Sequence, residues 1–121
     1  MNLRQIVYAS AVSTFLNVSS GCAILPDLKN PEVRMQLVGT YKGVIDGNKV
    51  TYKVKKEGCV ALVDFGPQFT IIVDKDCDNT ADLLNLTMDR KYLLETGKAK
   101  DVDYILKIIQ SKLVNPEHKV K

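Results

Sequence analysis

Alternating apolar and polar residues in the middle of the chain predict an antiparallel β-sheet. Val50, Tyr52 and Val54 alternate with lysines and a threonine, which gives this run one apolar face and one polar face. Asp46-Gly47-Asn48 separates it from a second run at residues 41–46. An Asp-Gly pair in this position is typical of a β-hairpin turn, because glycine adopts a positive φ without strain. We therefore expect a hairpin with one face exposed to water.

Two further apolar runs extend the predicted sheet. They cover residues 59–65 and 69–74, and the Gly66-Pro67 pair between them favours a turn. Residues 83–87 fit either a fifth strand or a helical turn, and residues 88–97 fit either a short helix or an irregular segment. The sheet is thus expected to have four to five strands.

The segment before the sheet allows two interpretations. Asn30 followed by Pro31 is typical of the start of a helix. Apolar residues at odd positions from Val33 onward fit a strand instead. We favour a short helical turn over residues 31–38 that becomes a strand near Val38.

The C-terminal part of the chain predicts one helix over residues 101–114. Its apolar residues have helical spacing, with Asp101 expected as the cap: Val102, Ile105, Leu106, Ile109 and Leu113. Lys107, Gln110, Ser111 and Lys112 are expected to face water, and residues 116–121 to form a frayed tail. The expected fold is α+β: an antiparallel β-meander packed by one C-terminal helix, within a single domain at residues 38–115.

Composition narrows the classes of function. A length of 121 residues suits one domain. The net charge of +3 comes from basic residues scattered among acidic ones, and the chain has no tryptophan. Proteins that bind nucleic acids usually combine a clustered basic face with aromatic side chains. We therefore expect no nucleic-acid partner.

The first 22 residues have the pattern of an export signal. Arg4 precedes an uncharged stretch at residues 6–18, which is too short to span a bilayer. Small residues, Ser20 and Gly21, then precede Cys22. This end resembles a bacterial lipoprotein signal, although Ser19 stands where leucine is usual. The resemblance implies a signal peptide at 1–21 and a lipid on Cys22. Pro26 and Asp27 favour a short tether after it, which together with the helical turn covers residues 22–37. Cleavage without lipidation, giving a secreted or periplasmic protein, and an uncleaved cytosolic helix are the alternatives.

The other two cysteines are placed to form a disulfide bond. A hairpin that turns at Gly66-Pro67 brings Cys59 opposite residue 75, close to Cys77. An exported compartment permits the bond, whereas a reducing cytosol favours two free thiols.

An acidic loop follows the fourth predicted strand. Asp74, Asp76, Asp78, Thr80 and Asp82 lie at alternating positions, a spacing that suits oxygen ligation of Ca²⁺. The loop resembles the first nine positions of an EF-hand, dockerin or thrombospondin-repeat calcium loop, which implies a calcium site formed by these residues. Asn85 stands where those loops have a bidentate acid, and a solvated acidic loop is the alternative.

No catalytic constellation accompanies these features. The one histidine, His118, lies in the expected tail, and glycine-rich phosphate loops are absent. We expect a protein that is not an enzyme: a small exported, lipid-anchored envelope protein with a binding or structural role. Its partners would be the membrane, through the lipid, and another protein. An inhibitor or accessory factor that is secreted or periplasmic, and a cytosolic interaction module, are the alternatives.

Overall fold

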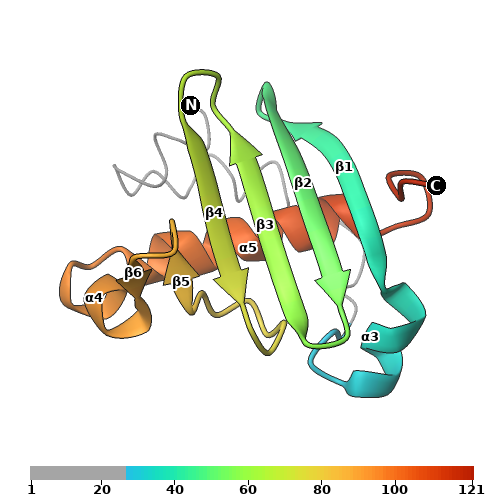
Figure 1. The fold of residues 1–121 in the computed structure, drawn as a ribbon, viewed down its shortest axis with the longest axis horizontal. Coiled ribbons are helices and arrows are strands. Elements are labelled where there is room, and N and C mark those ends of the chain that lie inside the picture. The colour runs from blue at the N-terminus through green and yellow to red at the C-terminus, as the bar shows by residue number, and fades with distance from the viewer. Residues whose placement is uncertain (1–26) are drawn as a thin grey trace.

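Six antiparallel strands follow one another along the chain and form a single sheet in the order β1 to β6 (Figure 1). The computed structural model describes residues 27–121. The strands are β1 Gly39–Ile45, β2 Asn48–Lys55, β3 Gly58–Asp64, β4 Phe69–Asp74, β5 Leu83–Leu84 and β6 Met88–Asp89. The helices are α3 Pro31–Leu37, α4 Arg90–Glu95 and α5 Ala99–Leu113. The predicted α+β meander with a C-terminal helix is confirmed, and the short β5 and β6 extend it.

The β1–β2 hairpin has the two-residue turn that the sequence predicts. Ile45 pairs with Asn48, so Asp46 and Gly47 alone form the turn. Both residues have positive φ, 52° for Asp46 and 78° for Gly47. This is the conformation of a type I′ turn, which matches the twist of the strands that it joins.

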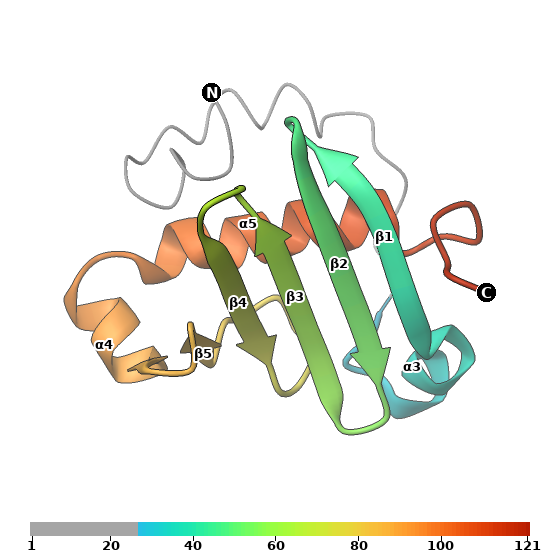
Figure 2. The same ribbon diagram turned by 45° about the horizontal axis from the view of Figure 1, so that its top comes forward.

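Helix α5 lies across one face of the sheet and covers the core (Figures 1 and 2). The largest fully buried side chains come mainly from β1, β2, β4 and α5: Tyr41, Tyr52, Leu28, Ile72, Leu84, Leu93, Ile105, Leu106, Ile108 and Ile109. The apolar stripe predicted for this helix is therefore its buried side.

The structure corrects three details of that helix. It begins at Ala99, with Lys98 at the N-cap, so Asp101 lies in the first turn and is not the cap. Gln110 is buried, at 1% exposure, and does not face water. Ile108 is buried as well, although it lies outside the expected stripe. The sheet and the surrounding loops thus cover a wider side of α5 than a single stripe of apolar residues indicates.

The segment before β1 is a helix, as favoured from Asn30-Pro31. The Asn30 side chain accepts a hydrogen bond from the Glu32 N–H at 3.0 Å, and Pro31 is the first helical residue. Ahead of the helix, Leu28 is 1% exposed and belongs to the core. The part of the tether at residues 27–30 is therefore attached to the domain.

The last residues do not form a frayed tail. Lys119 makes an antiparallel bridge with Tyr41 of β1. The Lys42 N–H donates to the His118 carbonyl oxygen at 3.0 Å, and the Val120 N–H donates to the Thr40 carbonyl oxygen at 2.7 Å. The tail expectation was wrong because an edge strand offers unpaired backbone groups, and a polar segment pairs with them as readily as an apolar one.

This pairing predicts that the tail stabilises the domain. Truncation after Glu117 removes both backbone hydrogen bonds, each worth about 0.5–1.5 kcal/mol. We expect a loss of roughly 1–3 kcal/mol in the free energy of unfolding, measured by urea denaturation. The Lys42 amide should also lose protection from hydrogen exchange. Unchanged stability together with unchanged exchange at Lys42 would show that the tail is frayed.

Candidate functional site

The predicted disulfide bond joins Cys59 and Cys77. It connects the start of β3 to the loop after β4, with the two Cα atoms 5.3 Å apart. Cys59 pairs with Asp74 in the sheet, one position from the residue expected opposite it. Both cysteines are buried, so the bond is part of the core beneath the acidic loop.

Asp74 is a buried residue whose side chain holds the acidic loop in place by hydrogen bonds. It is fully buried, and its two carboxylate oxygens accept the backbone N–H groups of Asp78 and Asn79, at 3.2 and 2.8 Å. Burial raises the pKa of Asp74 to about 7, while the backbone hydrogen bonds from Asn79 and Asp78 oppose the rise. Burial and then the nearby Asp74 also raise the pKa of Tyr52. Asp74 thus holds the loop closed against the sheet.

Two other loop aspartates also bind backbone groups. Asp82 accepts the Lys75 N–H at 2.7 Å, and Asp78 accepts the Thr80 N–H at 3.0 Å. Cys77 and Asn79 adopt the left-handed conformation, with φ of 56° and 65°, and this bends the loop tightly. Within residues 27–121, no group of three or more carboxylate, histidine or cysteine side chains is placed to hold a metal ion. The calcium site at Asp74, Asp76, Asp78, Thr80 and Asp82 stays a prediction. The observed side-chain contacts give Asp74, Asp78 and Asp82 a role in shaping the loop.

An ion pair that the sequence did not predict attaches the same loop to two helices. Arg90, at the start of α4, contacts both carboxylate oxygens of Asp103 in α5, at 2.7 and 2.9 Å. Asp103 also accepts the Ala81 N–H at 2.8 Å, and Arg90 donates to the Ala81 carbonyl oxygen at 3.3 Å. The separation of 13 residues between the two charges gives no helical spacing, so no local pattern identifies this pair.

Some buried polar atoms lack a partner in the described part of the chain. They are the Tyr52 hydroxyl, the Asn79 side-chain oxygen and both amide atoms of Gln110. Gln110 and Asn79 line a depression of about 330 Å³ beside Asp27, Leu28 and Lys29. Unpaired buried groups of this kind reduce stability.

The face of the sheet opposite α5 forms the second candidate region. Among residues 27–121, no helix lies across it (Figures 1 and 2). We call it the open face and define it by the side chains that alternate with the buried ones along β1 to β5. Its basic half, on β1 and β2, contains Lys42, Lys49, Lys53 and Lys55. Its apolar half, on β3 to β5, contains Val60, Leu62, Phe69, Ile71, Val73 and Leu83.

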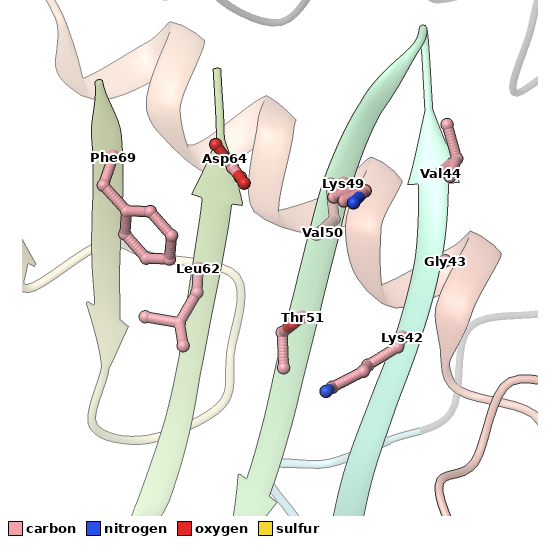
Figure 3. A pocket seen from close by; sticks show the side chains of 9 residues that line it. All are labelled: Lys42, Gly43, Val44, Lys49, Val50, Thr51, Leu62, Asp64 and Phe69. Atoms are coloured by element: carbon pink, nitrogen blue, oxygen red, sulfur yellow. The ribbon is translucent and has the colours of Figure 1, made fainter. Parts of the chain in front are cut away.

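Strand register places these side chains in rows across the open face. One row runs from Val44 through Lys49 and Asp64 to Phe69. Asp64 is the one acidic residue at the open-face positions of β1 to β4, and its carboxylate accepts the Gly66 N–H at 2.8 Å. The side chains around this row line a shallow depression of about 420 Å³. In Figure 3, Lys42 extends towards Thr51, and the Phe69 ring lies beside Leu62.

The apolar half was missed at the level of the sequence, although its signal was present. Residues 59–63 of β3 and 71–73 of β4 are continuously apolar, a pattern typical of strands that are covered on both faces. Only one face of these strands is covered by the described residues, where Val63 and Ile72 are buried. The other face of these strands leaves Phe69 at 56% exposure, and its remaining apolar side chains are half-buried: Val60, Leu62, Ile71 and Val73.

Comparisons with known protein families, with curated proteins and with solved structures found no match for this chain. Within residues 27–121, no helix has the length and hydrophobicity needed to cross a bilayer. Cys22 and the predicted export signal lie outside the described residues, so the signal and the lipidation stay predictions. The expectations that the protein is not an enzyme and binds no nucleic acid are predictions as well.

The disulfide analysis yields a stability prediction. Replacing Cys59 and Cys77 together by alanine leaves Cys22 in place and frees a loop with a sequence separation of 18. Constraint of a loop of this length contributes about 3 kcal/mol by the chain-entropy relation. We expect a loss of that size in urea denaturation at neutral pH.

Wild-type protein treated with dithiothreitol is the matched control, and it should unfold at the urea concentration that unfolds the double variant. Equal stability of the oxidised wild-type protein and the double variant would contradict a stabilising disulfide bond.

Proposed function

We propose that the protein is exported to the cell envelope, is held at a membrane by a lipid on Cys22, and acts there by binding another protein through the open face. The observation that carries the binding role is the apolar half of that face. Its strands are apolar on both sides, and the described residues cover only one side. A contiguous apolar surface bordered by polar residues is typical of a protein interaction site.

The disulfide bond supports export. Stable disulfides form in oxidising compartments and are rare in the cytosol. Cys59 and Cys77 are joined and buried, which favours an extracytoplasmic location over the cytosolic alternative. The pattern of small residues before Cys22 supports the anchor, because it resembles the site at which lipoprotein signals are cleaved and modified.

The anchor would fix where binding occurs. A lipid at the mature N-terminus leaves only a short connection to Leu28, which is part of the core. The domain would therefore stay close to the membrane surface and meet partners of the envelope there. An inhibitor or accessory factor without a lipid would use the same open face, and the test below separates the two.

The anchor is tested by fractionating cells that express the full chain or its Cys22→Ala variant. We expect the wild-type protein in the membrane fraction and the variant in the soluble fraction or as an unprocessed precursor. The variant with both Cys59→Ala and Cys77→Ala, which removes the disulfide bond but not the lipid site, is the control and should stay in the membrane fraction. Wild-type protein that is soluble, with an intact mass that shows no lipid, would refute the anchor and favour the secreted alternative.

A further inference from the structure

We infer that the open face takes an acidic, amphipathic segment of a partner protein, with its carboxylates over β1 and β2 and its apolar side chains over β3 and β4. This inference rests on the proposed binding function and specifies the partner of that same face. Three features of the face support it: the contrast between its basic and apolar halves, the distance between the halves, and the depression.

The charge of the face selects an acidic partner. None of the lysines of its basic half forms an ion pair with a described residue. Strand pairing places Lys42 opposite Thr51, and Lys53 opposite Thr40 and Val60. Four lysines therefore stand against the one carboxylate of Asp64. Such a surface attracts carboxylates and discriminates against basic segments.

The apolar half supplies the contact area. Its side chains are adjacent across strands: Val60 pairs with Val73, Leu62 with Ile71, and Val73 with Leu83. Phe69 closes this half at the end that carries the depression. Aromatic side chains that are exposed next to an apolar surface are common anchors of protein interfaces.

The spacing of the two halves fits a helix. Neighbouring strands lie about 4.8 Å apart, so the middle of β1–β2 and the middle of β3–β4 are separated by about 10 Å. An α-helix with its side chains is about 10–12 Å wide. A helix with an acidic flank beside an apolar flank therefore spans both halves at once.

Two other occupants fit the face less well. A bilayer surface is smooth on this scale, whereas the face is hollowed beside Leu62 and Phe69 and carries Asp64, which would oppose lipid phosphates. A second copy of this chain would bring the lysines against one another or against the apolar half, and it offers them only the Asp64 carboxylates. The depression instead suits an apolar side chain that projects from the partner.

The experiment uses protein isolated from cells that express the full chain. The probe is a synthetic helical peptide with glutamates along one flank and leucines along the other, followed by fluorescence anisotropy. We expect it to bind at least tenfold more tightly than the same peptide with lysine in place of glutamate. The amide NMR signals of β1 to β4 should shift on binding, while those on the exposed side of α5 should not.

Charge-reversal variants distinguish binding at the open face from an effect of the protein's overall charge. Lys49→Glu with Lys53→Glu should weaken binding at least tenfold, and Phe69→Ser should weaken it at least threefold. Lys91→Glu with Lys107→Glu carries the same change in charge on exposed positions of α4 and α5, and should leave the affinity within twofold.

Several outcomes would overturn the inference. They are equal affinity for both peptides, equal losses in the two double variants, peptide-induced shifts confined to other surfaces, and a dimer formed through this face. Shifts of the open-face signals with anionic phosphatidylglycerol vesicles, but not with neutral phosphatidylcholine vesicles, would also overturn it, because a lipid on Cys22 inserts into both kinds of vesicle. If the wild-type protein is membrane-bound but does not prefer the acidic peptide, the proposed acidic partner is refuted and the lipid anchor is not. Soluble wild-type protein that still binds the acidic peptide refutes the anchor alone.

Discussion

The packing of α5 across one face of the meander is the contact on which the rest of the structure depends. A sheet of short strands cannot bury enough apolar surface by itself, so one face must be covered. Among the described helices, α5 is the longest and supplies most of that cover, with Val102, Ile105 and Ile109 against the sheet. Tyr41, Tyr52 and Ile72 meet it from the strands. Because α5 packs on one face of the sheet, the opposite face is not covered by a described helix.

A disulfide bond, hydrogen bonds and an ion pair between residues far apart in the sequence hold the other elements in place around this contact. The Cys59–Cys77 bond and the buried carboxylate of Asp74 close the loop after β4. Asp103 of α5 binds both Arg90 and the Ala81 backbone, which joins that loop to the helix. Asp74, Asp78 and Asp82 thus stabilise the fold of the loop in this structure, because their side-chain oxygens accept hydrogen bonds from backbone N–H groups.

The sequence predicts those parts of the fold that depend on local patterns. Alternation with a period of two located the first two strands, and apolar runs bounded by turn residues located the third and fourth. Asp46-Gly47 located the hairpin turn, and Asn30-Pro31 located the start of α3. Hairpin register also predicted that Cys59 and Cys77 lie close together, and the two are bonded in the structure. Each of these follows from preferences of a few neighbouring residues, which a sequence displays directly.

The parts that could not be predicted depend on residues far apart in the chain. Pairing of Lys119 with Tyr41 needs the end of α5 to arrive beside β1, and nothing near residue 119 indicates it. Burial of Gln110 likewise depends on what surrounds the helix. The apolar half of the open face was indicated by the continuous runs in β3 and β4, but the sequence does not show which of their faces is covered.

The central claim is that one face of the sheet is covered by α5 and the other is free to bind. A soluble paramagnetic agent tests it directly through broadening of methyl NMR signals in the isolated protein. We expect strong broadening for Leu62 and Ile71, on the open face, and protection for Val63 and Ile72, which are buried beneath α5. Equal protection of all four methyl-bearing side chains would contradict the account, because the open face would then already be covered.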